Sequence, residues 1–217
     1  MASNVFGNPI TDQTLRGLPE YKDKPVITAT DRATVALNMK NAGNKDVNAR
    51  KFVENLKERY GNGVSTLCLV YNATGGTLNF VLSHDWHGHI GESPYPQQID
   101  NGQWGAYLHV HTSGAAVGSS AAVVYRGKNE GGTTCDWMFG WSNPWNRWGN
   151  DNTVYTEIRE YRHYEDNNHW NYIQDKVEGS GLTHSDTWNG CVSTVATGSS
   201  TSPILQAILT LENAEGL

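Results

Sequence analysis

The spacing of apolar residues changes near residue 64, and the two parts of the chain predict different secondary structure. Before that point, residues 28–43 and 46–63 are typical of helices, most clearly where apolar residues of the second segment recur every three or four positions. Asp46 is placed to cap the second helix, and Gly61 is placed to end it. The sequence therefore predicts two N-terminal helices.

After residue 64 the apolar positions alternate, and turns rich in Gly, Asn and Ser separate short runs. The alternation is clearest where Trp104, Ala106, Leu108 and Val110 fall on one face of a strand. The predicted strands are 65–73, 77–86, 104–112, 120–127, 135–142, 152–160, 190–197 and 202–212. No helical pattern alternates with these strands. They therefore predict an antiparallel β-sandwich over residues 65–217, with residues 1–64 as a helical extension packed on it.

The charge is distributed unevenly around a net value of −6. Residues 1–64 contain ten Lys or Arg and seven Asp or Glu, whereas residues 65–217 contain six and fifteen. An acidic main body lacks the basic surface that phosphate backbones require, which argues against nucleic acid as a partner. It also disfavours simple attraction to anionic lipid surfaces.

Cysteine usage and the N-terminus indicate a cytoplasmic protein. The three cysteines are widely spaced, which favours reduced, buried thiols over a disulfide framework. The opening residues MASNVFGNPI show no basic region followed by an apolar run, so we expect no secretory signal. No apolar stretch approaches the roughly 20 residues that a transmembrane helix needs.

Four of the eight tryptophans lie in residues 135–150, CDWMFGWSNPWNRWGN. Trp137 and Phe139 fall in an alternating strand, and we expect them in the core. Trp145 and Trp148 follow Pro144 among loop-forming residues, where exposing an indole requires a reason. Indole rings bind quaternary ammonium groups, stack on sugars and settle at membrane interfaces. This loop is therefore a candidate binding site.

Histidines form a second candidate site. His87 and His89 lie in the segment SHDWHGHI, and His109 and His111 lie two residues apart on one face of a predicted strand. Neutral imidazoles in such an arrangement can bind Zn²⁺, Cu²⁺ or Ni²⁺. The alternative is that His109 and His111 only form the polar face of their strand.

Several long motifs resemble one plant family. The segments KFVENLKERYGNG, YNATGGTLNFV, HDWHGHI, NGQWGAYLHVH, AAVVYR and VYTEIRE, together with their order, resemble the plant 23 kDa jasmonate-induced protein family over nearly the whole chain. The resemblance implies a protein induced by jasmonate during stress or defence. It implies no defined biochemical activity.

A second and more distant resemblance concerns the tryptophan-rich loop. YNATGGTL, SGAAVGSSAAVVY and MFGWSNPWNRWGNDNTVYTEI resemble, in that order, the actinoporin-type cytolysins and their fungal lectin relatives. That family's Ser-x-Pro-aromatic loop corresponds to Ser142, Pro144 and Trp145, and Trp148 and Tyr164 fall near its later aromatic residues. The resemblance implies a β-sandwich that recognises a phosphocholine or sphingolipid headgroup, or a glycan.

Motifs of enzymes are missing from the sequence. We find no Gly-x-Ser-x-Gly turn, phosphate-binding loop or dinucleotide fingerprint. We therefore expect a non-enzymatic recognition module without a cofactor that associates peripherally with a membrane lipid or with a glycan. The alternatives are a membrane-permeabilising cytolysin of the same fold and a histidine-based metal-binding protein.

Overall fold

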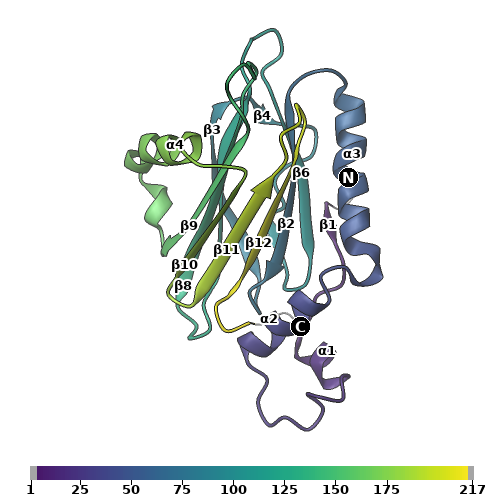
Figure 1. Ribbon diagram of the computed structural model, residues 1–217. Helices are drawn as coiled ribbons and strands as arrows, with labels where there is room; N and C mark the ends of the chain where they lie inside the picture. Colours follow the sequence, from purple (N-terminus) through teal and green to yellow (C-terminus); the bar gives the residue numbers. More distant parts are fainter. Residues whose placement is uncertain (1–3, 215–217) are drawn as a thin grey trace.

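Two β-sheets pack face to face in the computed structural model, which describes residues 4–214 apart from the side chain of Asn167 (Figure 1). The seven-stranded sheet has the order β1–β6–β2–β12–β11–β10, with β4 also paired to β6, and the five-stranded sheet has the order β5–β3–β7–β8–β9. The strands are β1 (Val5–Phe6), β2 (Ser65–Ala73), β3 (Leu78–His87), β4 (His89–Ile90), β5 (Gln98–Ile99), β6 (Trp104–Val110), β7 (Ser119–Lys128), β8 (Thr134–Asn143), β9 (Thr153–Glu160), β10 (Thr183–Trp188), β11 (Cys191–Thr197) and β12 (Ile204–Leu211). The predicted β-sandwich is confirmed.

All eight predicted strands are present, as β2, β3, β6, β7, β8, β9, β11 and β12. One pair departs from the expected antiparallel arrangement, because β12 runs parallel to β2 with Ile204 opposite Leu67. Among the missed strands, β1, β4 and β5 have only two residues each. β10, with the sequence THSDTW, was missed because its alternating positions are polar rather than apolar.

Both predicted helices are present, as α2 (Ala29–Asn38) and α3 (Lys45–Tyr60). The predicted cap of α3 is wrong: Asn44 precedes the helix in a left-handed conformation without a side-chain cap, and Asp46 lies inside the first turn. The remaining helical elements are α1 (Asp12–Arg16), α4 (Trp170–Glu178) and the 3₁₀ turns η1 (Ala42–Asn44), η2 (His163–Glu165) and η3 (Asn167–His169). No helix in residues 4–214 is long and apolar enough to cross a membrane.

Three apolar clusters hold these layers together. The central one lies between the sheets and includes Trp137, Phe139 and Trp141, so the expected core positions of Trp137 and Phe139 are confirmed. A second cluster joins the outer face of the seven-stranded sheet to α3 through residues such as Val53 and Trp104. The third lies between the five-stranded sheet and α4, on the opposite side of the molecule from α3 (Figure 1). Both outer faces therefore carry a helix.

The N-terminal residues are joined to the seven-stranded sheet by packing, strand pairing and hydrogen bonds. β1 pairs with β6, so that Val5 lies opposite Gly105. Lys45, at the start of α3, is 5% exposed and donates hydrogen bonds to the hydroxyl of Tyr71 at 3.2 Å and to the carbonyl of Gly102 at 2.7 Å. Burial lowers the pKa of Lys45 to about 8. Residues on both sides of position 64 are thus held together by packing and by hydrogen bonds.

The two sheets also meet along the edge strands β9 and β10. The backbone amide of Thr156 in β9 donates to Nδ1 of His184 at 3.3 Å, and that of Ile158 donates to the carboxylate of Asp186 at 2.8 Å. The amide of Val154 completes the row by donating to the carbonyl of Gly181 at 2.9 Å. Side chains of β10 therefore provide acceptors that a neighbouring strand would otherwise supply.

Candidate functional site

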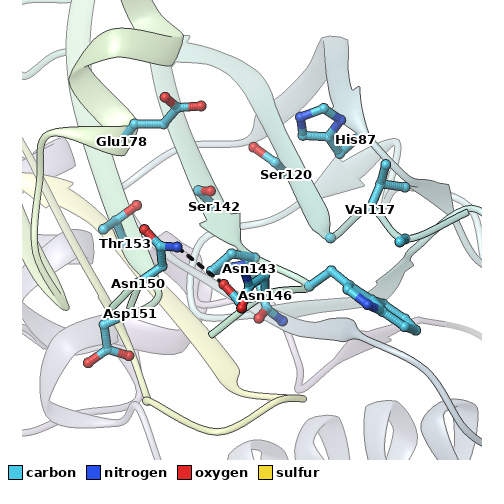
Figure 2. Close-up of a pocket in the computed structure, with 14 residues that line it drawn as sticks. His87, Val117, Ser120, Ser142, Asn143, Asn146, Asn150, Asp151, Thr153 and Glu178 are labelled. Atoms are coloured by element: carbon cyan, nitrogen blue, oxygen red, sulfur yellow. Dashed lines mark hydrogen bonds between the residues drawn. The ribbon is translucent and has the colours of Figure 1, made fainter. Parts of the chain in front are cut away.

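A pocket of about 500 Å³ lies where β7, β8 and β9 meet the loops at one end of the sandwich (Figure 2). Its floor contains a row of hydroxyl groups, because Ser120 in β7 is opposite Ser142 in β8, and Ser142 is opposite Thr153 in β9. Directly opposite residues in a sheet share a face. The other lining residues are His87, Ala116, Val117, Gly118, Asn143, Pro144, Trp145, Asn146, Asn150, Asp151 and Glu178.

Asn143 fixes the end of β8 where the wall of the pocket begins. Its side-chain amide donates to the carbonyls of Ser65 and Thr201, at 3.0 and 3.1 Å, and the residue is 1% exposed. Gly118 lies against the same point, and a Cβ atom there would be 2.1 Å from the carbonyl oxygen of Asn143. Only glycine permits this approach. The polypeptide therefore leaves β8 at Pro144 in a fixed direction.

Arg147 holds the following loop against the rest of the sandwich. Its guanidinium donates to the side chain of Asn152 at 2.7 Å and to the carbonyl of Ser200 at 3.2 Å, and it pairs with Asp151 at 3.2 Å. Asn152 in turn donates to the carbonyl of Ser200 at 2.9 Å. The positive charge of Arg147 is therefore balanced by Asp151 within the loop, and Arg147 does not line the pocket.

The two loop tryptophans differ in how they are held. Trp145 lines the pocket, is 46% exposed and packs its ring against that of His111. Trp148 is 91% exposed and lies outside the lining of the pocket. An indole without cover at a loop tip is unusual in a soluble domain and is typical of a contact surface.

The walls of the pocket are acidic and polar. Glu178, at the C-terminus of α4, and Asp151 supply two carboxylates, and no lysine or arginine is among the lining residues. The C-terminus of a helix adds partial negative charge at Glu178. The side-chain amide of Gln174 donates to the Glu178 carboxylate at 2.9 Å and orients it. The pocket is therefore suited to a cationic or hydroxyl-rich group.

The predicted ligand-binding residues separate into two groups. Ser142, Pro144 and Trp145 line the pocket together, and Trp148 lies in the same loop. Tyr164 is elsewhere: it is 1% exposed, packs beneath α4, and donates its hydroxyl to Glu157 at 3.0 Å. β9 carries the chain away from the pocket over its eight residues, about 25 Å, before Tyr164 is reached.

The four predicted metal ligands do not form one site. His87 lines the pocket, whereas His89 is exposed and contacts the carbonyl of Ile90 through Nδ1. His109 lies between the sheets, and His111 lies beneath Trp145. Within residues 4–214, no three His, Cys, Asp or Glu side chains are grouped to hold a metal ion. The face of β6 that carries Tyr107 and His109, with His111 just beyond the strand, is thus an inner face rather than a solvated one.

A hydrogen-bonded series of Ser, His and Asp side chains occurs inside the sandwich. Nδ1 of His109 lies 2.8 Å from the hydroxyl of Ser119, and Nε2 lies 3.2 Å from the carboxylate of Asp85. Both Ser119 and His109 are fully buried, and the indole of Trp141 also donates to Ser119 at 3.2 Å. Burial lowers the pKa of His109. A substrate cannot reach this hydroxyl. The hydrogen bonds between Ser119, His109 and Asp85 therefore order the core instead of forming a catalytic triad.

Sequence reasoning missed most of the residues that line the pocket. Ser120 and Thr153 join Ser142 only through strand register, which could be read from the predicted pairing of β7, β8 and β9. Glu178 had no signal in the sequence, because α4 was not predicted and its docking on the five-stranded sheet depends on tertiary packing.

Comparisons with known proteins agree with this architecture. A model of the Nakanori-like protein family matches residues 6–212. The 23 kDa jasmonate-induced protein of Hordeum vulgare is 54% identical over 203 residues, which cover 93% of this chain and 94% of that protein. A jasmonate-induced protein homolog of Atriplex canescens is 29% identical over 135 residues, covering 62% and 71% of the two chains.

A solved structure is similar over nearly the same length. The crystal structure of the lipid-binding protein Nakanori superposes with a TM-score of 0.87 at 35% sequence identity, covering 94% of this chain and 98% of that chain. The resemblance to jasmonate-induced proteins that the motifs indicated is therefore confirmed. The chain belongs to the Nakanori-like protein family.

Proposed function

We propose that this protein is a non-enzymatic recognition module that binds the headgroup of a zwitterionic membrane lipid in the pocket between Trp145 and Glu178. The observation that carries the proposal is the pairing of an acidic, concave pocket with an exposed tryptophan loop. The pocket accepts the cationic end of the headgroup, and Trp148 enters the interfacial region of the bilayer. The protein then associates peripherally with the membrane during a jasmonate response.

The chemistry of the walls supports this assignment. Trp145 offers a ring face to an ammonium group, and the carboxylates of Asp151 and Glu178 add favourable charge. The hydroxyl of Ser142 and the side-chain amides of the loop supply neutral hydrogen-bond donors for a phosphate. Nakanori, which shares this fold at 35% identity, is described as a lipid-binding protein.

We do not extend the proposal to membrane permeabilisation. A segment that inserts must first leave the folded domain, yet α3 buries Ala49, Val53 and Leu56 against the seven-stranded sheet. The exposed side of α3 carries charges such as Arg50 and Glu54, which are costly at mid-bilayer. Release of this segment would therefore expose apolar core without supplying an apolar helix.

Vesicle flotation beside a glycan array tests the proposal. Vesicles of phosphatidylcholine with sphingolipid and vesicles that include phosphatidylethanolamine should both be assayed, with dye release measured in the same samples. We expect flotation with zwitterionic vesicles, no dye release, and no signal on the array. Binding to glycans alone would mean that the ligand is a sugar and not a lipid. Folded protein that binds neither would refute the proposal.

A matched pair of aromatic variants locates the contact. Trp145→Ala should weaken flotation, whereas Tyr172→Ala should leave it unchanged. Tyr172 is 48% exposed, nearly the same as Trp145, but it lies on α4 and does not line the pocket. Equal loss of flotation in both variants would show that exposed aromatic surface, and not this pocket, provides the contact.

A further inference from the structure

We propose that Cys135 and Cys191 are a redox-active pair of thiols, which a peroxide converts into a disulfide bond between the two sheets. Cys135 lies near the start of β8 in the five-stranded sheet, and Cys191 is the first residue of β11 in the seven-stranded sheet. Both cysteines are free and fully buried in the apolar cluster between the sheets. The proposal concerns a modification and is independent of the proposed lipid binding.

Two turns at one end of the sandwich bring the cysteines together. Cys135 comes just after the turn 129–133, and Cys191 comes two residues after Asn189 in the hairpin of β10 and β11. The side-chain amide of Asn129 donates to the carbonyl of Asn189 at 2.9 Å, so the first turn is tied to the second. The strands that follow these turns therefore begin next to each other on opposite sides of the core.

The surroundings of the two thiols give them different roles. Burial raises the pKa of Cys135, but hydrogen bonds from the side chains of Cys191 and Asn189 lower it in part. Burial and the neighbouring Cys135 both raise the pKa of Cys191. Cys135 is therefore the thiol that ionises first and attacks the oxidant, because the thiolate is the nucleophile. Cys191 keeps its proton and reacts second.

The two thiols together reduce one molecule of hydrogen peroxide. The sulfur of Cys135 attacks one peroxide oxygen, the O–O bond breaks, and a sulfenic acid and a water are formed. The sulfur of Cys191 then attacks the sulfenic sulfur, the S–O bond breaks, and a second water leaves as the S–S bond forms. Two electrons pass from the thiols to the peroxide, and the two thiol hydrogens leave in the waters.

Oxidation requires only a local opening of the turn beside Cys135. The thiol of Cys135 contacts the carbonyl of Thr133 at 3.5 Å, and residues 130–133 are exposed. Exposed turns of this kind open without unfolding of the whole domain. Because both thiols are buried and hold their protons at neutral pH, we expect oxidation to be slow and to accelerate as the pH rises.

Cys68 provides a control inside the same core. It is fully buried and lies on β2 opposite Leu205 of β12, whereas Cys191 lies opposite Leu211. β12 runs for about 20 Å between these two positions. Cys68 is therefore buried like the pair but is too far from Cys191 to form a disulfide with it.

Thiol mapping of the full chain tests the proposal. Reduced protein should be treated with hydrogen peroxide under native conditions, then denatured and alkylated with iodoacetamide. We expect the oxidised chain to be lighter by two hydrogen atoms, Cys68 alone to be alkylated, and one pair of peptides to be linked through Cys135 and Cys191. Three alkylated cysteines, a bond to Cys68, disulfide-linked dimers or sulfonic acids in place of the disulfide would overturn the proposal.

Serine variants separate the two reacting thiols from the third. Cys68→Ser should form the same disulfide at the rate of the wild type. Cys191→Ser should stop at the sulfenic acid of Cys135, which dimedone labels. A folded Cys191→Ser that dimedone does not label would contradict the role assigned to Cys135. If Cys191→Ser does not fold, the linked peptides of the wild type still decide whether the pair exists.

The disulfide should also stabilise the protein. It closes residues 135–191, which include β9, α4 and the loop that carries Trp145, and it restricts the unfolded chain. In urea, we expect the equilibrium constant for unfolding to be at least about tenfold smaller for oxidised than for reduced protein. Peroxide-treated Cys68→Ser should show the same gain, and Cys135→Ser should show none. Equal stability of the two redox forms would overturn the disulfide as a link between the sheets.

Discussion

The indole of Trp145 lies tilted by 41° against the imidazole of His111, with the ring centroids 5.1 Å apart. His111 is 8% exposed and is itself packed edge-on against Tyr60 of α3, at 6.0 Å. The aromatic contact therefore links the loop after β8 to the residue that follows β6 and to the end of α3. It restrains Trp145 at the edge of the pocket, so the proposed ligand would cost less conformational entropy on binding.

Trp145→Ala and Trp137→Ala should have opposite effects on stability and binding. Trp145→Ala is expected to weaken vesicle binding by about 1–3 kcal/mol, as truncation of an aromatic anchor does, with only a small change in stability. Trp137 is fully buried between the sheets, and its truncation should cost about 3–5 kcal/mol of the free energy of unfolding. Urea unfolding and vesicle titration of both variants measure these effects. Early unfolding of Trp145→Ala would show that the loop is part of the core.

Tyr164→Phe should leave lipid binding unchanged. The hydroxyl of Tyr164 donates to the carboxylate of Glu157 at 3.0 Å, beneath α4, and takes no part in the pocket. Glu157 keeps the hydroxyl of Tyr155 and the guanidinium of Arg159, so we expect a loss of about 1–3 kcal/mol in stability. Flotation and urea unfolding together decide this. Weaker binding at full stability would mean that Tyr164 reaches the ligand after all.

Arg126→Met should destabilise the protein strongly without changing the residues that line the pocket. Asp136 is fully buried, and Arg126 donates to both of its oxygens, at 2.6 and 2.8 Å. Removal of the guanidinium leaves a buried carboxylate without its counter-ion, which costs about 3–5 kcal/mol. The double variant Arg126→Met with Asp136→Leu should recover part of this loss in urea unfolding. No recovery would mean that Arg126 acts mainly through Glu165, its other partner at 2.9 Å.

The stability of the protein should gain a contribution from Lys45 as the pH rises above 8. The pKa of Lys45 is lowered to about 8 from an ordinary value of 10.5, so between these values the unfolded chain binds more protons than the folded chain. Unfolding then takes up a proton, and the free energy of unfolding rises with pH by at most about 1.4 kcal/mol per unit. Below pH 8 both states are protonated and this dependence ends.

The difference between the wild type and Lys45→Met isolates this effect, because tyrosines and cysteines titrate in the same range in both proteins. We expect that difference to shift in favour of the wild type from pH 8 to pH 10 in urea unfolding. A constant difference would show that Lys45 remains protonated in the folded protein, held by the carbonyl of Gly102.

Local pattern was sufficient for most of the fold and for part of the site. The alternation around Trp137 and Phe139 predicted the strand and its buried face correctly, and Pro144 marked the point where the chain leaves the sheet. Both signals act within a few residues. β10 and α4 were missed because their positions depend on packing. β10 is polar at every position except Trp188, and α4 is defined by the apolar face that Ile173 and Val177 present to β8.

Dependence on tertiary packing also explains the errors at the site. Tyr164 is only 16 positions beyond Trp148, but β9 carries it to the other end of its sheet. Glu178 is farther along the sequence and yet lies at the pocket, because α4 returns along the outer face of that sheet. His87 and His109 were expected to act together, but the structure directs one to the pocket and the other into the core.

The contact between β9 and β10 has a consequence for the behaviour of the protein at high surface density. An exposed edge strand is a template on which a second chain can add, and crowding on a membrane would favour such polymerisation. Here the amides of Val154, Thr156 and Ile158 are already occupied by Gly181, His184 and Asp186. If the proposed membrane binding holds, many copies could therefore concentrate on one bilayer without growing into fibrils along this edge.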